Sequence, residues 1–328
     1  MGKLVSVVIP CKNEGKHLGR CLASVLNQNY SNLEAIVVDG MSKDDSAKIV
    51  SNFMLRNLNV FLFENTKENS AAGMNIGIRN SKGEVIIILG AHSEVPSDFI
   101  LKSVDCLEKT GADVVGGPLK TVGEGYLGEI IALVLSSPFG TGTKFRYSDS
   151  AQYVDTVPFG AYKAGILKRV GLFNEGIPRS EDLELNHRII SAGGEIYMHP
   201  DIKPTYYCRG DLPGFIKQNF GNGYDTMRAA LKNRKAVSLR HLIPFCFVSS
   251  LIILWIGIFF SGGLKYLLAA DIVAYILANL FFSVHESLKA GFRYLMALPL
   301  IFLVLHLSYG AGSIWAVFRS ALKFRLRS

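Results

Sequence analysis

Short apolar runs alternate with amphipathic stretches through roughly the first third of the chain. Runs rich in β-branched residues predict strands buried on both faces, because such strands read as nearly continuous apolar segments. These runs are residues 4–10, 33–39, 60–64, 84–89 and 114–115. The stretches between them carry apolar residues at helical spacing. The alternation predicts a doubly wound α/β domain with a nucleotide-binding type of sheet.

The intervening helices are marked by apolar spacing and by start signals. Residues 18–26 and 71–79 repeat apolar side chains every three to four positions, and Pro96 is expected to open a further helix. Ser42, followed three residues later by Asp45, predicts a capping box for the helix after the second strand.

The pattern is less regular after the fifth strand. Residues 152–161 predict a strand. Residues 183–192 predict a helix that is capped by Ser180 and stopped by the Gly193–Gly194 pair.

Beyond His241 the chain is almost continuously apolar. Residues 242–261 and 264–284 are each long enough to cross a bilayer, and a glycine pair joins them. A third apolar stretch, residues 294–318, contains His306, Ser308, Gly310 and Gly312. We expect this stretch to be a re-entrant or interfacial element broken at residues 308–312, with a plain third span as the alternative.

Residues 212–240 separate the two parts. One face of a predicted helix is apolar and the other is basic, so the helix either lies in the headgroup layer or packs on a core. The apolar face comprises Phe215, Ile216, Phe220, Tyr224, Met227 and Leu231. A basic run up to Arg240 follows. Beside a membrane segment, such a run favours anionic lipid over nucleic acid.

Composition supports this division. Hydrophobic residues make up 49% of the chain and the net charge is +8, with seven basic and two acidic residues in 241–328. Five cysteines match neither a zinc pattern nor a disulfide framework, so we expect them to stay reduced. The first residues enter a strand without the apolar region of a signal peptide. We therefore expect a multi-pass protein of the cell membrane with a cytoplasmic first domain.

Candidate chemistry lies at the ends of the predicted strands, where open α/β sheets bind ligands. The first strand ends in residues 10–14, the second in Asp39 and Gly40, and the fourth in residues 90–92. No G-x-G-x-x-G follows the first strand, which argues against a dinucleotide oxidoreductase.

The ordered motifs VVIPCKNE, VVDGMSKDDS, NIGI and RSEDLELNHRI resemble those of family-2 glycosyltransferases with the A-type fold. The stretches SSPFGTGTKFR, YVDTVPFGAY and HLSYGAG are similar to the branch of succinoglycan-type exopolysaccharide glycosyltransferases. The resemblance covers nearly the whole chain. It implies an inverting hexosyltransferase that uses a nucleotide-sugar, with residues 1–211 as the catalytic domain and residues 241–328 as the membrane anchor.

The resemblance also implies residue roles for the donor. Asp39 matches the acid that hydrogen-bonds the base, as a carboxylate can with a uracil N–H; the alternative is a turn residue in an Asp-Gly pair. The full nucleotide-sugar-binding set is Pro10, Asn13, Glu14, Asp39, Gly40, Asn75 and Ala91.

Asp182 matches the general base of the family, and Glu181 beside it is assigned to the catalytic site. Inversion by direct displacement needs a general base that takes the proton of the acceptor hydroxyl. We expect the helix dipole to keep Asp182 ionised. The alternative is that both acids only decorate a helix N-terminus.

The chain departs from the family at the fourth strand, where Asp-x-Asp or Asp-x-His usually grips a divalent metal. Gly90 replaces the first ligand and His92 keeps the second position. The resemblance implies Mn²⁺ or Mg²⁺ as cofactor, although such cations prefer oxygen ligands. We expect Gly90→Asp to keep or tighten metal binding. Alternatively, His92 hydrogen-bonds phosphate or caps a turn.

Gln218 begins a Gln-Asn-Phe-Gly-Asn run where processive polymerases of the superfamily carry Gln-x-x-Arg-Trp, so we expect a non-processive enzyme with Gln218 on the acceptor side. The expected reaction moves one sugar, UDP-linked, to a lipid-linked glycan at the membrane. A polyprenyl phosphate acceptor is one alternative. A non-catalytic sugar-nucleotide-binding membrane protein is another.

Overall fold

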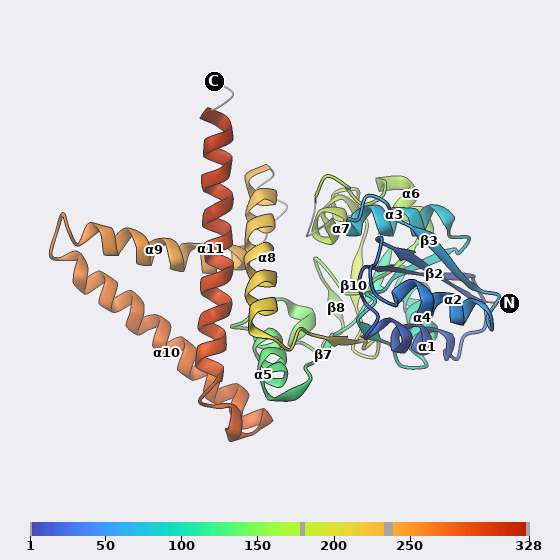
Figure 1. The fold of residues 1–328 in the computed structure, drawn as a ribbon, viewed down its shortest axis with the longest axis horizontal. Coiled ribbons are helices and arrows are strands. Elements are labelled where there is room, and N and C mark those ends of the chain that lie inside the picture. Colours follow the sequence, from blue (N-terminus) through green and yellow to red (C-terminus); the bar gives the residue numbers. More distant parts are fainter. Residues whose placement is uncertain (1, 178–180, 233–238, 326–328) are drawn as a thin grey trace. The chain divides into compact units, whose positions relative to one another are not determined.

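The computed structural model describes residues 2–177, 181–232 and 239–325 (Figure 1). The chain forms two compact units. The first comprises Met1–Lys120 and Tyr147–Tyr207, and the second comprises Thr121–Arg146 and Cys208–Ser328. A segment from the middle of the sequence thus belongs to the C-terminal unit. The functional division into catalytic, interfacial and anchoring segments stays a prediction.

The first unit contains an eight-stranded mixed sheet of order β3-β2-β1-β4-β9-β6-β10-β8. The first four strands pair in parallel, whereas β9 runs antiparallel between β4 and β6. The strands are β1 Val5–Cys11, β2 Leu33–Asp39, β3 Val60–Glu64, β4 Val85–Ile88, β6 Val114–Gly116, β8 Gln152–Tyr153, β9 Ala161–Lys163 and β10 Ile196–Met198. The α/β sheet expected from the apolar runs is confirmed.

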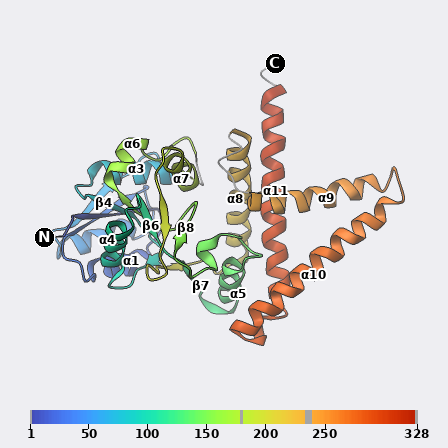
Figure 2. The ribbon, with the colours of Figure 1, turned by 180° about the vertical axis from the view of Figure 1, so that it is seen from behind.

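Helices cover both faces of this sheet, as the two opposite views of Figures 1 and 2 show. Alternate residues of β1 face opposite ways. Val5, Val7 and Ile9 pack with α1, α2 and α4, while Val8 lies against Gly77 of α3. The helices of this unit are α1 Leu18–Leu26, α2 Ser46–Met54, α3 Ser70–Asn80, α4 Phe99–Thr110, α6 Ala164–Val170 and α7 Glu181–Ser191.

A small sheet of order β5-β11-β7 contains β5 Ser93–Glu94, β11 Thr205–Tyr207 and β7 Lys120–Val122. It matters for the site because β5 directly follows the end of β4. Tyr207 N donates to His92 O at 3.0 Å, so β11 is fastened to the turn after β4.

Two local expectations are wrong. Residues 152–161 do not form one strand, because β8 ends at Tyr153 and the chain turns through Pro158 before β9 begins. The capping box also does not form: α2 begins at Ser46, and Asp45 makes no capping bond with its side chain. Ser42 is used instead by the loops at the sheet edge. The helix expected at 183–192 is confirmed as α7, while its proposed cap Ser180 lies outside the described residues.

The second unit consists mainly of helices, drawn in green for α5 and in yellow to red for the others (Figure 1). They are α5 Gly125–Ser136, α8 Leu212–Lys232, α9 Ile243–Gly257, α10 Leu264–Ala290 and α11 Leu298–Arg325. A core of α5, the start of α8 and the start of α11 includes Ile131, Phe215 and Phe302.

Helix α8 packs lengthwise on α11 (Figure 2). A Cβ on Gly223 would lie 2.0 Å from Tyr309 O, and a Cβ on Gly312 would lie 2.0 Å from Phe220 O. Glycine therefore permits this close helix contact. The described part of residues 212–240 is thus a helix that packs on α11, while its place in the headgroup layer stays a prediction.

The expected break in the third apolar stretch is wrong, because α11 runs without interruption. Its polar and small residues contact neighbouring helices and the turn that follows α5. His306 Nε2 lies 2.9 Å from Phe139 O, and a Cβ on Gly310 would lie 2.5 Å from Pro244 O. The first expected span is also shorter than predicted, since α9 has 15 residues.

Within the described ranges, two helices are long and apolar enough to cross a membrane: Leu264–Ala290 and Leu298–Leu322. This assignment rests on length and composition. The most apolar part of the first is 11% buried, against 50% for the second. Exposed apolar side chains on α10 such as Leu277 and Phe281 suggest association with a membrane.

Candidate active site

Asp39 is the last residue of β2 and lies beside Cys11, the last residue of β1. Its side chain is 7% exposed. The carboxylate accepts hydrogen bonds from the backbone N and the hydroxyl of Ser42, and Cys11 Sγ lies 3.7 Å from Oδ1. Burial beside this carboxylate raises the pKa of the Cys11 thiol well above its usual range. Asp39 is therefore held in place at the carboxyl edge of the sheet.

Asn13 joins the loops that follow β1 and β2. Its backbone N donates to Ser42 Oγ at 2.8 Å, and its Oδ1 accepts from Lys43 N at 2.8 Å. The next residues are tied in the same way: Glu14 N donates to Ser46 Oγ and Gly15 N donates to Asp44 Oδ2. The two loops thus form one rigid edge.

Gly40 and Pro10 help to shape this edge. Gly40 N donates to Cys11 O at 2.8 Å, and a Cβ at position 40 would lie 3.3 Å from that oxygen. Pro10 packs near Gly73 of α3. Neither contact tests the predicted role in donor binding, which stays a prediction.

Several residues at the same edge of the sheet have a strained backbone conformation with positive φ. The residues other than glycine that the structure describes with positive φ are Asn13, Met41, Glu68 and Phe159. The first three follow β1, β2 and β3, and Phe159 precedes β9 beside the end of β4. Such conformations cost about 1–3 kcal/mol each and persist where the surrounding structure enforces them, often at functional sites.

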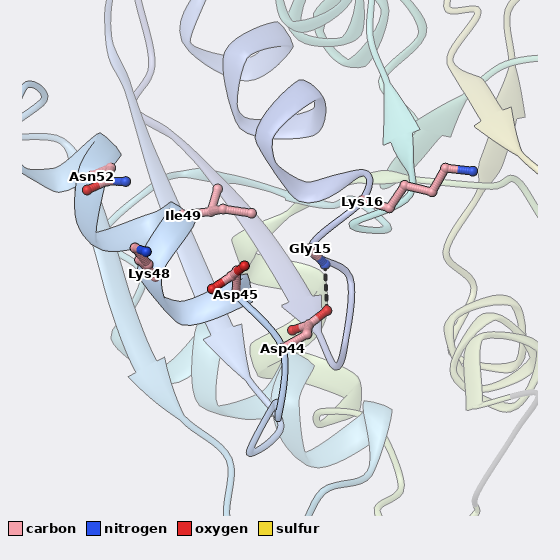
Figure 3. A pocket seen from close by; sticks show the side chains of 7 residues that line it. All are labelled: Gly15, Lys16, Asp44, Asp45, Lys48, Ile49 and Asn52. Atoms are coloured by element: carbon pink, nitrogen blue, oxygen red, sulfur yellow. Dashed lines mark hydrogen bonds between the residues drawn. The ribbon is translucent and has the colours of Figure 1, made fainter.

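An open pocket flanks these loops (Figure 3). It is lined by Gly15, Lys16, Asp44, Asp45, Lys48, Ile49 and Asn52. The hydrogen bond from Ser46 and those from backbone N–H groups lower the pKa of the Asp44 carboxyl. The lining contains none of the residues predicted to bind donor, so we regard the pocket as a neighbour of the candidate site.

At the end of β4, the carbonyl of Gly90 accepts from Ser93 N at 3.1 Å, from Ser93 Oγ and from Cys21 Sγ. Ala91 is buried. His92 Nδ1 lies 3.1 Å from Glu14 Oε1, and its ring packs edge-on against Tyr206 at 5.1 Å between centroids. The structure therefore pairs the predicted ligand His92 with the predicted donor residue Glu14.

These residues do not fit a divalent cation held by the protein. Gly90 offers no side chain, and His92 can offer only Nε2, because its Nδ1 lies 3.1 Å from Glu14 Oε1. In the described ranges, no group of three or more His, Cys, Asp or Glu side chains could hold a metal ion. Mg²⁺ and Mn²⁺ sites ordinarily use several oxygen ligands.

Asp182 lies in the first turn of α7 and accepts from Leu183 N at 2.9 Å. The side chain is open to solvent, yet the protein around it desolvates the carboxyl, which raises its pKa against the effect of the backbone N–H groups. The backbone N–H groups at the helix terminus lower this pKa, but desolvation outweighs them, and the expected ionised state of Asp182 stays a prediction. Burial raises the pKa of the Tyr162 hydroxyl on β9, and the nearby charge of Asp182 raises it further.

Two polar side chains hold the segment that precedes α7 in the sequence, residues 170–175. Arg188 pairs with Glu184 and donates to Val170 O at 2.6 Å and Leu172 O at 2.7 Å. Asn75 is buried; its amide exchanges two 2.9 Å hydrogen bonds with the backbone of Phe173 and donates to Glu175.

The contacts of Asn75 are thus structural, and its predicted contact with donor stays a prediction. The same holds for the roles of Glu181 and Gln218. Gln218 is half-buried on α8 in the second unit. Sequence reasoning missed Phe159 and Arg188. Glycine in place of the usual aspartate at position 90 was the one sequence signal that another side chain could occupy this space, as Phe159 does.

Comparisons with known proteins agree with this geometry. The model of Glycosyl transferase family 2 matches residues 6–170. The chain is 27% identical, over 93% of its length and 95% of the relative's, to a dolichyl N-acetyl-alpha-D-glucosaminyl phosphate 3-beta-D-2,3-diacetamido-2,3-dideoxy-beta-D-glucuronosyltransferase of Methanococcus voltae. It is 28% identical to succinoglycan biosynthesis protein ExoA of Rhizobium meliloti, over 73% of each chain.

A solved structure has the same fold. The mannosyltransferase PcManGT from Pyrobaculum calidifontis, determined in complex with GDP-Man and Mn²⁺, superposes with a TM-score of 0.63. The alignment covers 97% of this chain and 88% of the other at 16% identity, so it supports the fold alone.

Proposed function

Since the chain belongs to glycosyl transferase family 2, we propose that it moves one sugar from a UDP-linked donor, with inversion, to a lipid-linked glycan. The observation that carries the proposal is the fixed carboxylate of Asp39 at the sheet edge, together with Asp182 at the start of α7. The first suits binding of a nucleotide base, and the second suits proton transfer.

The donor assignment rests on hydrogen-bonding chemistry. Ser42 holds Asp39 while the outer part of the carboxylate can still accept an N–H from a base, as uracil offers. Asn13 and the loop after β1 lie beside it and would contact the ribose. Because the loops are already tied together, little ordering is needed when the nucleotide binds.

The chemical step is a single displacement. Asp182 takes the proton from the acceptor hydroxyl as that oxygen attacks the anomeric carbon. The bond between this carbon and the donor's diphosphate breaks, and the diphosphate leaves with the electron pair. The raised pKa of Asp182 brings the base closer to the operating pH, which makes it a better proton acceptor than an ordinary Asp carboxylate.

The acceptor assignment draws on the relatives and on the apolar helices. One relative is named as a transferase acting on a dolichyl-linked sugar phosphate, and another serves succinoglycan biosynthesis. Helices α10 and α11 would keep the enzyme at the surface where lipid-linked acceptors reside. We propose the cell membrane as its place, with the first unit in the cytoplasm because the sequence before α9 is basic.

Full-length protein in lipid nanodiscs, given UDP- and GDP-sugars with a polyprenyl-diphosphate-linked sugar, tests the proposal. We expect nucleotide release with one UDP-sugar and a product of inverted anomeric configuration by NMR. Transfer from GDP-sugars alone would overturn the donor assignment, and transfer to bare polyprenyl phosphate would overturn the acceptor assignment. Nucleotide binding without release from any donor would favour the non-catalytic reading.

A further inference from the structure

The space beside Gly90 is occupied by an aromatic ring. A Cβ built on Gly90 would lie 3.0 Å from Phe159 Cε1 and 3.4 Å from its Cζ. Contacts of 3.0–3.4 Å are tighter than nine in ten Cβ contacts in proteins, so the ring would have to move by a few tenths of an ångström even for a Cβ. The longer side chain of aspartate would extend further. The ring therefore stands where the first ligand of the usual metal motif would begin.

The backbone at position 90 is firmly held. The carbonyl of Gly90 accepts from the backbone and the hydroxyl of Ser93 and from Cys21 Sγ, and Leu89 N donates to Val8 O at 2.9 Å. A new side chain at position 90 cannot be accommodated by moving this turn without breaking those bonds. The ring would have to move instead.

The backbone that carries the ring is held by the antiparallel insertion of β9. Ala161 pairs with Ile87 of β4, and Ile88 N donates to Gly160 O at 3.2 Å, so the residue before Gly160 must lie at the end of β4. Phe159 itself has φ 47°, in the left-handed region that bulky residues avoid. The surrounding structure enforces this conformation and directs the side chain to Gly90.

We infer that Gly90 and Phe159 form a matched pair in which the ring of Phe159 takes the place of the first metal ligand. The protein then lacks a carboxylate on β4 for a divalent cation, in agreement with the poor fit of the remaining side chains. The contact between Gly90 and Phe159 does not depend on the proposed function. The inference rests on that function in one respect, namely that this region is called the donor site. The pair changes the expectation that Gly90→Asp keeps or tightens metal binding. As a single substitution, it places the new carboxylate in contact with the ring of Phe159.

Cation binding to the nucleotide-free, full-length protein tests the pair. Mn²⁺ affinity is measured by electron paramagnetic resonance and unfolding by thermal melting, for Gly90→Asp, Phe159→Gly and the double variant. We expect weak Mn²⁺ binding by the parent and by each single variant, and a lowered Tm for Gly90→Asp. The double variant should regain the Tm lost by Gly90→Asp and bind Mn²⁺ at least about 10–100-fold more tightly, the change that loss of even an outer partner of a metal site typically causes.

The shape-matched control is Gly90→Asn with Phe159→Gly, which fits the same space without the charge and should gain far less Mn²⁺ affinity. Two outcomes would overturn the pair. One is that Gly90→Asp alone binds Mn²⁺ as tightly as the double variant without loss of Tm, and the other is that the double variant gains nothing. Neither readout uses turnover, so a failure of the proposed function would appear separately, as absent nucleotide release.

Discussion

Asp39 and Asp182 are both acids at the edge of the same unit, but their surroundings differ. Asp39 is buried at the end of β2 and is bound by the backbone and hydroxyl of Ser42. Asp182 is open to solvent at the start of α7, and its pKa is raised by the protein around it. A carboxylate that its neighbours hold in one place is suited to recognition of a fixed partner, whereas one with a raised pKa is suited to accepting a proton.

The largest effect is expected at Asp182. Asp182→Asn keeps the shape but cannot act as a base, so transfer should fall about 10²–10⁴-fold, while UDP affinity stays nearly unchanged. Initial rates of nucleotide release and calorimetry with UDP measure the two quantities. Asp105→Asn on α4 is the matched control for loss of one carboxylate. Parent-like turnover in Asp182→Asn would remove this residue from the mechanism.

Asp39→Ala should act on binding instead. It removes a hydrogen bond to a charged group, worth about 1.5–3 kcal/mol, or about 10–150-fold in the Kd for UDP. Asp45→Ala is the control, because Asp45 carries the same charge nearby and makes no capping bond with its side chain. Equal UDP affinity in calorimetry for the parent and Asp39→Ala would count against recognition of the base by this carboxylate.

The pH dependence sharpens the contrast. The raised pKa of Asp182 places the acidic limb of kcat/KM above the pH expected for an ordinary Asp, with activity falling about tenfold per pH unit below it. Because the folded-state pKa is raised, folding favours the protonated form. The resulting contribution to stability is fully present below the unfolded pKa and is lost as pH rises through the folded pKa. A rate profile from acidic to neutral pH tests the first statement. A limb at the ordinary Asp value would contradict it.

The smallest effect is expected at Asn13, which holds the edge around Asp39. Asn13→Ala must keep φ near 55° without the hydrogen bond to Lys43 N, whereas Asn13→Gly adopts this φ freely. The alanine variant should therefore be less stable than the glycine variant by about 1 kcal/mol, as measured by chemical unfolding. The opposite order would show that the left-handed backbone at Asn13 is not a source of strain.

The sequence by itself determined the strands and most helices of the first unit, because apolar runs and helical spacing follow from which side chains must leave water. It also placed Asp39, Gly90 and His92 at strand ends, since parallel strands bring their carboxyl ends to one edge. These are consequences of local pattern and common topology.

The remaining features were decided by contacts between segments far apart in the sequence. Ser42 binds Asp39 and Asn13 across two loops instead of capping α2. The polar and small residues of α11 contact α8, α9 and the turn after α5, and the helix continues through them. Phe159 reaches Gly90 only because β9 inserts antiparallel beside β4. Such pairings depend on which backbone and side-chain groups meet after folding, which local spacing along the chain does not specify.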